Sequence, residues 1–201
     1  MNLIFLDIDG VLNNLDPENV RHLNDLCVQA DARIVVSSSW RNHGRARLAR
    51  WLGAHGLQRP YHRVMATLPL FLPGDWIEWG EAERSDIYRG LEIEAWMLQN
   101  LDEEALGSTR IVILDDDGDM GRLGHLWVRT TCFSGPDELD PVKYRYTGPY
   151  NGLQTEHVDQ ALRLLEGQKP IGTLLAVPNP HWTGKARGAL RLLREMSQMN
   201  P

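Results

Sequence analysis

The stretch LIFLDIDG at residues 3–10 decides the fold. Its first four residues are apolar, and the run ends at two acids and a glycine. A short apolar run closed by such residues is typical of a buried strand. Because side chains two positions apart on a strand point the same way, Asp7 and Asp9 are expected to face one site at the end of this strand.

Similar apolar or β-branched runs predict further strands at ARIVVSSS (32–39), RIVIL (110–114) and HLWVRTT (125–131), with a weaker one at 61–68. Between the strands, apolar side chains recur at helical spacing. The predicted helices follow an N-cap at Asp16, cover 45–54 and 89–100, and follow an N-cap at Thr155. Strands that alternate with helices predict an α/β fold, a three-layer Rossmann-like parallel sheet with helices on both faces.

The chain is long enough for one domain, which we assign to residues 1–167. Residues 168–201 form a C-terminal extension that ends in a predicted helix at 185–197. The extension is either a sixth strand–helix unit or an appendage.

Composition excludes several classes of protein. Apolar residues make up 42% of the chain and supply a sizeable core, so the chain is not intrinsically disordered. No apolar run approaches the roughly 18 residues of a membrane span, so no membrane partner is expected. Two cysteines, Cys27 and Cys132, are too few for a disulfide framework, and we expect reduced thiols and a cytoplasmic location.

The net charge of −6 argues against a broad cationic nucleic-acid binder. The charge is unevenly distributed, however. Residues 41–63 hold six arginines and no acid, and residues 168–201 carry a net charge of +4. We call residues 41–63 the basic island; most such runs are solvated helix faces.

Three predicted strands end in polar groups that suit one another. The first ends in Asp7 and Asp9, the second in serines followed by Arg41, and the fourth in the triplet 115–117. In open α/β sheets, ligands bind at the carboxyl ends of the strands. So many carboxylates at one edge would repel each other unless a cation lay among them, and oxygen ligands without a His–Cys pattern favour Mg²⁺. The hydroxyls and a guanidinium then suggest phosphate binding.

Four segments in order resemble the motifs of the haloacid dehalogenase (HAD) superfamily of phosphohydrolases. They are FLDIDGVLN (5–13), VVSSSWR (35–41), YRGLEIEAW (88–96) and ILDDDGDM (113–120). The second and fourth look more narrowly like the small HAD domains of Swiss-army-knife RNA-repair proteins. YNGLQTEHVDQAL (150–162) resembles the closing helix of those domains, so the resemblance covers roughly residues 1–166.

The resemblance implies a role for individual residues. Asp7 would be the nucleophile that becomes an aspartyl-phosphate, and Asp9 the general acid and then the base. The phosphate would be held by Arg89 and by either Ser38 or Ser37. Arg89 stands where the superfamily often has Lys, but it keeps the charge and can bind two oxygens.

The metal would be Mg²⁺, held by Asp7, Asp115, Asp116 and the backbone carbonyl of Asp9. Asp119 either orients Arg89 or a metal-bound water, or caps a helix, and the part that Asp117 plays is left open.

Substrate choice in this superfamily depends on cap insertions. Only one helix fits between the first two motifs, so the cap is minimal or absent, and a loop at 69–84 is large enough for a flap. An open site admits a large substrate, such as a nucleic-acid end or a phosphoprotein. Further substrate contacts are possible at Arg41, for a second phosphate, and at Asn13, where a turn role is the alternative. In the loop, Trp76 and Trp79 either stack bases or belong to a partial core.

The leading hypothesis is a Mg²⁺-dependent phosphatase whose substrate is a phosphorylated nucleotide or polynucleotide end. A small-metabolite or mononucleotide phosphatase is the alternative among enzymes. A non-catalytic HAD-derived binding module is the third reading, and the complete pair of Asp7 and Asp9 argues against it.

Overall fold

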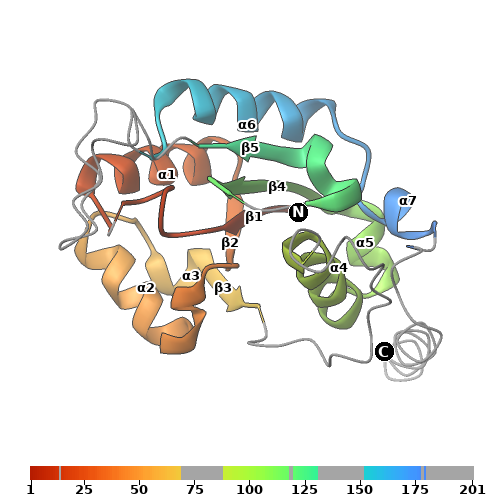
Figure 1. Cartoon of the computed structure of the whole chain (residues 1–201), viewed down its shortest axis with the longest axis horizontal. Coiled ribbons are helices and arrows are strands. Elements are labelled where there is room, and N and C mark those ends of the chain that lie inside the picture. Colours follow the sequence, from red (N-terminus) through yellow and green to blue (C-terminus); the bar gives the residue numbers. More distant parts are fainter. Residues whose placement is uncertain (14, 69–87, 118–119, 131–151, 178, 180–201) are drawn as a thin grey trace.

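Five parallel strands form the sheet at the centre of the protein (Figure 1). The computed structural model describes residues 1–13, 15–68, 88–117, 120–130, 152–177 and 179. The strand order is β3-β2-β1-β4-β5, which confirms the predicted Rossmann-like α/β fold. The strands are β1 (Asn2–Leu6), β2 (Ala32–Val36), β3 (Val64–Thr67), β4 (Arg110–Asp115) and β5 (Trp127–Arg129).

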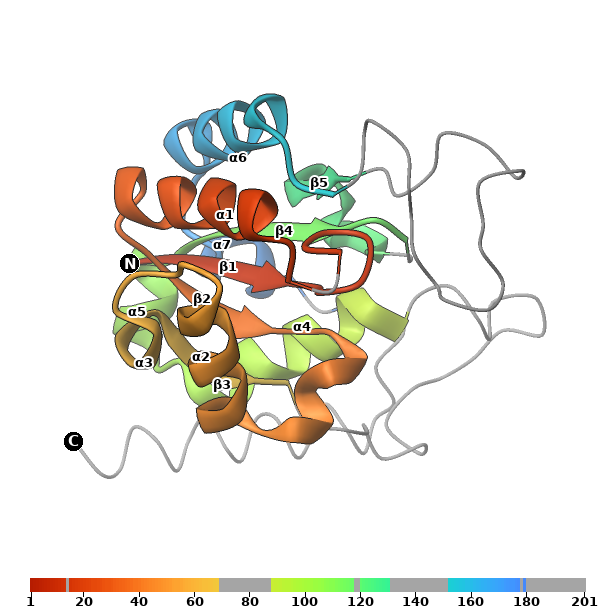
Figure 2. The same ribbon diagram turned by 90° about the vertical axis from the view of Figure 1, so that its left-hand side faces the viewer.

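Helices cover both faces of the sheet. They are α1 (Pro17–Gln29), α2 (Arg45–Ala54), α3 (Pro60–Arg63), α4 (Tyr88–Asn100), α5 (Glu103–Ser108), α6 (Thr155–Gly167) and α7 (Gly172–Leu175), with 3₁₀ helices η1 (Ser39–His43) and η3 (Gly121–Leu126). Figure 2 shows α1 and α6 on one side of β1 and β4, with α4 on the other. Between β1 and β2, the described residues include one helix, α1, and no cap domain.

The core divides into two clusters because side chains alternate along each strand. Ile4 and Leu6 of β1 pack in the cluster that includes α1, α2 and α6, whereas Leu3 and Phe5 pack with α4, α5 and η3. Phe5 meets Trp96 of α4 edge to face, with ring centroids 5.7 Å apart. The continuous apolar run at residues 3–6 therefore results from burial of β1 on both faces.

The strand register brings the predicted polar residues to one level. Leu6 pairs with both Val36 and Leu114. The hydrogen bonding continues one residue further, because Ser37 N donates to Leu6 O (2.8 Å) and Asp7 N donates to Leu114 O (2.9 Å). Chain order reverses between β1 and β4, so Asp7 and the end of β4 lie at the switch point where such sheets bind ligands.

Several element boundaries differ from the sequence expectations. Residues 61–63 of the weaker predicted strand belong to α3, and residues 125 and 126 of the strand predicted at 125–131 belong to η3. The strand predicted over 32–39 ends at Val36, because Ser38 caps η1 by accepting a hydrogen bond from Trp40 N. The N-cap of α6 is Gln154 and not Thr155, since Gln154 and His157 bond each other's backbone amides in a capping box.

The start of the C-terminal extension packs against the sheet. The side-chain amide of Gln168 accepts a hydrogen bond from the N–H of Ile111 (2.8 Å) and donates one to its carbonyl (3.1 Å). Strand β5 pairs with β4 only from Ile113 onward, so Gln168 takes the place of a strand partner at Ile111. Residues 172–175, part of the possible sixth strand, are instead helical as α7. The helix predicted at 185–197 lies outside the described residues, and the domain boundary at 167 stays a prediction.

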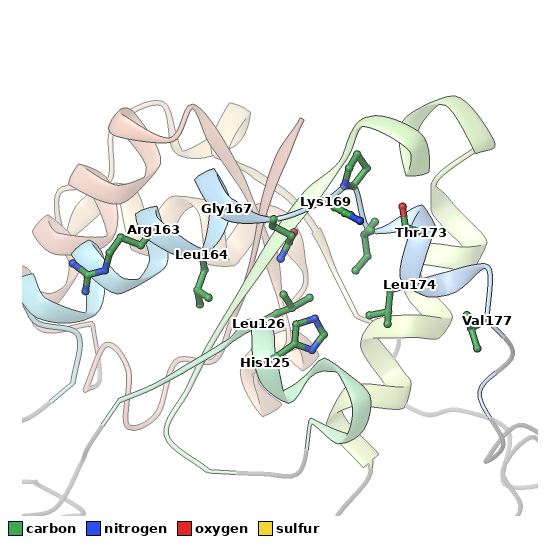
Figure 3. A pocket seen from close by; sticks show the side chains of 12 residues that line it. His125, Leu126, Arg163, Leu164, Gly167, Lys169, Thr173, Leu174 and Val177 are labelled. Carbon is green, nitrogen blue, oxygen red and sulfur yellow. The ribbon is translucent and has the colours of Figure 1, made fainter.

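A hollow of about 530 Å³ lies between the C-terminal part of α6, η3 and α7 (Figure 3). Leu126, Leu164 and Ile171 supply part of its apolar lining, and Arg163 and Lys169 also line it. It lies toward the beginning of β4 and β5 and contains none of the predicted site residues. Within the described part of the chain, no helix is long and apolar enough to cross a membrane.

Candidate active site

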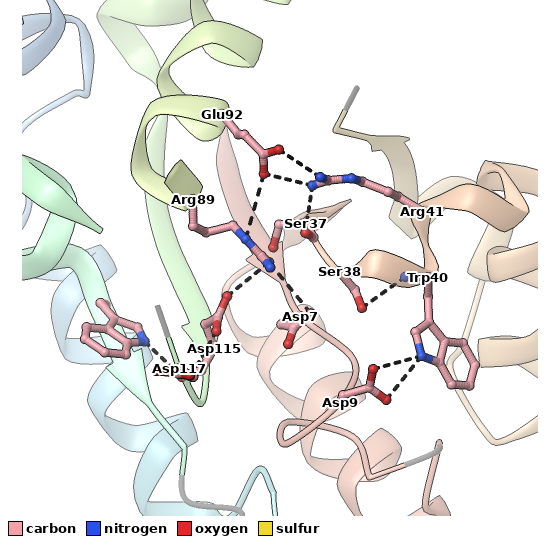
Figure 4. A network of polar contacts seen from close by, with 11 residues as sticks. Asp7, Asp9, Ser37, Ser38, Trp40, Arg41, Arg89, Glu92, Asp115 and Asp117 are labelled. Carbon is pink, nitrogen blue, oxygen red and sulfur yellow. Dashed lines mark hydrogen bonds and ion pairs between the residues drawn. The ribbon is translucent and has the colours of Figure 1, made fainter. Parts of the chain in front are cut away.

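Three carboxylates come together at the carboxyl ends of β1 and β4. Asp7, Asp115 and Asp116 each place an oxygen within 4.8 Å of the others. Figure 4 shows two of them, Asp7 and Asp115, on either side of the Arg89 guanidinium. Asp115 is 1% exposed and Asp7 is 8% exposed, whereas Asp116 is half-buried. The structure thus assembles a potential oxygen-ligand site for a cation from three of the four predicted metal-binding residues.

Gly10 makes room for Asp116 beside the first strand. Its φ is +72°, and a Cβ at this position would collide with the carboxylate of Asp116. The carbonyl of Gly10 accepts a hydrogen bond from Thr130 Oγ1 (2.9 Å) at the end of β5. A side chain at residue 10 would therefore strain the turn and displace one of the three carboxylates.

Arg89, on the first turn of α4, supplies positive charge to this cluster. Its Nη1 lies 3.1 Å from Asp115 Oδ2 and 3.7 Å from Asp7 Oδ1. Both Arg89 Nη1 and Asp115 Oδ2 are buried and have no hydrogen-bond partner among the described residues, so their contact is an ion pair without directed hydrogen bonding. Gly90 allows α4 to come this close, because a Cβ there would meet the backbone carbonyl of Met120.

Burial dominates the protonation of the two innermost acids. Burial raises the pKa of Asp115 to about 8; Arg89 opposes this shift, while Asp7 adds to it. Burial also raises the pKa of Asp7, against the lowering effects of Arg89 and a hydrogen bond from Ser38. One guanidinium therefore does not offset the desolvation of the carboxylates.

The two predicted phosphate-binding serines have different surroundings, although both are fully buried. The Ser38 hydroxyl bonds Asp7 and accepts from the backbone N–H of Trp40 (3.3 Å). Within the described part of the chain, the Ser37 hydroxyl has no hydrogen-bond partner, and its backbone carbonyl accepts from Arg41. Both lie at the site, and the choice between them as phosphate ligand stays open.

Asp9 has a more exposed position than Asp7. Its carboxylate accepts from Trp40 Nε1, with 3.1 Å to each oxygen. Partial burial raises its pKa, while the Trp40 hydrogen bond lowers it and the charge of Asp116 raises it. Trp40 was not among the predicted site residues. The sequence did offer one signal for it, because its indole N–H, a hydrogen-bond donor, directly follows the serines at the end of the second predicted strand.

Arg41 contacts a buried acid instead of standing free for a second phosphate. Its guanidinium forms a bidentate pair with Glu92 of α4, at 2.8 and 2.9 Å. The two side chains are 11% and 1% exposed, and Glu92 also lies 3.9 Å from Arg89. Glu92 was not among the predicted site residues, although an acid three residues after Arg89, among apolar residues of α4, was an available signal. A phosphate contact of Arg41 stays a prediction.

Asn13 has the left-handed φ of 45°, which suits a turn. Its Oδ1 is buried without a hydrogen-bond partner, and its substrate contact also stays a prediction. Asp117 is exposed and donates its backbone N–H to Asp115 Oδ1 (3.1 Å). The following residues lie outside the described part of the chain: Asp119, Trp76, Trp79, Cys132 and the rest of the 69–84 loop.

Part of the basic island is used in structural contacts. Arg63 is buried and donates to Ala32 O (2.8 Å) and Asp31 (3.1 Å). Arg45 donates to the backbone carbonyls of Tyr61 and Val64. The remaining members, Arg47, Arg50 and Arg59, are exposed.

Residues 3–136 match the model of a known family, the HAD domain in Swiss Army Knife RNA repair proteins. The chain belongs to this family. The match includes the four quoted motifs and all nine predicted site residues. No curated protein and no solved structure matches this HAD domain significantly.

The raised pKa values make the stability of the metal-free HAD domain depend on pH. The folded state holds a proton on Asp115 up to about pH 8, whereas the unfolded chain releases it near 3.8. The folded state thus binds more protons, and stability falls as pH rises through this window. In EDTA, we expect the free energy of unfolding to fall between about pH 7 and 8.5, by at most about 1.4 kcal/mol per pH unit for one proton.

Urea denaturation at several pH values measures this slope, and Asp115→Asn should flatten it. The range begins near pH 7 to avoid His157, whose pKa is lowered by burial and whose contribution has the opposite sign. A wild-type stability that rises or stays constant across the range would contradict the expected protonation.

Proposed function

We propose that this HAD domain is a Mg²⁺-dependent phosphatase that hydrolyses a phosphate monoester of a nucleotide or polynucleotide end. The observation that carries the proposal is the joining of Asp7, Asp115 and Asp116 with Arg89 at the switch point of the sheet. A nucleophilic carboxylate, metal-ligand carboxylates and a phosphate-binding cation are the groups that phosphoryl transfer to an aspartate requires. The family description supports a role in phosphate chemistry.

The donor set fits a hard divalent cation. All three side chains offer carboxylate oxygens, and Asp115 Oδ2 is buried without a hydrogen-bond partner. Mg²⁺ prefers such ligands together with water and phosphate oxygens. When bound, the ion would neutralise charge between the carboxylates and the phosphate and polarise a phosphate oxygen.

The residues divide the reaction between them. The Asp7 carboxylate attacks phosphorus while the bond to the leaving oxygen breaks, and Asp9 gives its proton to that oxygen. Asp9 then takes a proton from a water that attacks the aspartyl-phosphate, which releases phosphate and restores Asp7. Arg89, with Ser38 or Ser37, holds the phosphate oxygens during both steps.

The lack of a cap domain in the described connection between β1 and β2 supports a large substrate. One helix, α1, occupies the described connection between β1 and β2, so no cap domain covers the site from there. Three exposed arginines follow the serine run in the sequence: Arg47 and Arg50 on α2, and Arg59 after it. Their positive charge could bind further phosphates of a polynucleotide. A small-metabolite or mononucleotide phosphatase remains the alternative.

Asp7→Asn tests the chemistry. We expect Mg²⁺-dependent release of phosphate from 4-nitrophenyl phosphate to fall by at least about a thousand-fold, because the nucleophile is lost. Asp25→Asn is the control, since it makes the same change in an exposed pair on α1 with Arg21. Unchanged turnover in Asp7→Asn would exclude the aspartyl-phosphate route. Complete absence of turnover in the wild type, with retention of an RNA or protein partner, would favour the binding module.

A substrate panel tests the polynucleotide assignment. Oligonucleotides with a 3′- or 5′-phosphate, mononucleotides and sugar phosphates are compared by kcat/KM at fixed salt, because phosphate contacts weaken as salt rises. We expect at least about ten-fold preference for one oligonucleotide end. Equal or better turnover of mononucleotides or sugar phosphates would favour the alternative.

Two acids of α4 form a matched pair for testing how Arg89 is positioned. Glu92 binds Arg41 and approaches Arg89, whereas Glu94 binds Arg122 (2.8 and 2.9 Å) on the side of η3. Both acids are 1% exposed. Glu92→Gln should lower kcat/KM about ten- to hundred-fold, because a small displacement of a phosphate-binding group is costly.

Glu94→Gln should lower the free energy of unfolding by about 2 kcal/mol and leave kcat/KM within about two-fold. Steady-state kinetics and urea denaturation of both variants measure the difference. Equal losses of activity in the two variants would show that Glu92 acts through the stability of α4 alone.

A further inference from the structure

We propose that Trp40 is a positioning residue that fixes the Asp9 carboxyl group for proton transfer to the leaving oxygen. This inference rests on the proposed phosphatase function. Trp40 Nε1 lies 3.1 Å from both carboxylate oxygens of Asp9, although the two residues are 31 positions apart in the sequence. Figure 4 shows the indole N–H directed between the two oxygens.

Asp9 needs such a partner because it is an exposed residue in a turn whose neighbouring residues are buried. The residue is exposed and follows the end of β1, whereas Asp7 is buried beside Arg89 and Ser38. A carboxyl group that must reach the leaving oxygen works best when its orientation is fixed before the reaction. A single N–H shared by both oxygens restricts the rotation of the Asp9 side chain.

The Trp40 ring is itself held in place. It meets the rings of Trp51 and His43 edge to face, with centroids 5.8 and 6.2 Å away, and packs against the core cluster of α1 and α2. Its backbone N–H binds the hydroxyl of Ser38, which also bonds Asp7. Trp40 therefore links the orientation of Asp9 to the serine that contacts the nucleophile.

The consequence depends on the leaving group. As the Asp7–phosphorus bond forms and the phosphorus–oxygen bond breaks, the proton of Asp9 goes to the leaving oxygen. A basic alcohol, such as a ribose hydroxyl, requires this proton, whereas 4-nitrophenolate leaves without it. The Trp40 contact thus adapts the site to phosphate esters of alcohols, the class that includes nucleotide ends.

Trp40→Phe tests this inference, because it keeps an aromatic ring and removes the N–H. For phenyl phosphate and benzyl phosphate, we expect kcat/KM to fall at least about ten-fold, since general acid catalysis contributes two or more orders of magnitude. For 4-nitrophenyl phosphate, kcat/KM should change less than about two-fold. The ratio kcat/KM is the useful measure, because it includes only the steps up to departure of the leaving group.

Trp51→Phe is the matched control, because Trp51 belongs to the same ring cluster and has no contact with Asp9 among the described interactions. It should affect all three substrates equally. Thermal melting checks that both variants fold, and Trp40→Met, an apolar replacement without a donor, takes the place of Trp40→Phe if the latter unfolds.

The outcomes separate this inference from the proposed function. If the wild type turns over the three esters and Trp40→Phe slows them equally or not at all, Trp40 does not position Asp9 and the phosphatase assignment stands. If the wild type hydrolyses neither the three esters nor any of the oligonucleotide and nucleotide substrates, the phosphatase assignment fails and this inference fails with it. A loss confined to the basic leaving groups supports the positioning role.

Discussion

The repulsion among buried carboxylates is the constraint on which the arrangement of the site depends. Asp7 and Asp115 end neighbouring strands, and Asp116 joins them within the same small volume. Burial raises the pKa of both Asp7 and Asp115. The charged forms of these acids persist at neutral pH only where positive charge is brought to them.

The fold brings that charge from a different segment. Helix α4 crosses the sheet face opposite α1 and places Arg89 against both strand-end acids (Figure 2). Glu92, one turn later on α4, pairs with Arg41 from the segment after β2. Among the described ion pairs of the site, Arg89 contacts Asp7 and Asp115, and Arg41 contacts Glu92. One guanidinium for two buried carboxylates leaves repulsion that the proposed metal would reduce.

Site residues that directly follow strand ends were predictable from the sequence, whereas those that depend on contacts across the fold were not. The positions of Asp7, Ser37 and Asp115 follow from the parallel sheet, because the carboxyl ends of its strands meet at one edge. Arg41 stood beside the serines in the sequence, but its partner Glu92 is 51 positions away, so its ion pair could not be foreseen. Trp40 was missed for a related reason, since an aromatic residue by itself predicts packing more readily than a hydrogen bond to an acid.

Asp7 and Asp9 look equivalent in the sequence, but the structure gives them different burial and different hydrogen-bond partners. Asp7 is enclosed by Arg89 and Ser38 at the bottom of the site, while Asp9, two residues later, is exposed and held by an indole N–H. Different environments are what allow two carboxyl groups to take different roles in one reaction. On the proposed mechanism, the enclosed acid attacks a phosphate held deep in the site, and the exposed acid meets the leaving group. The division between Asp7 and Asp9 therefore agrees with the proposed roles of nucleophile and general acid.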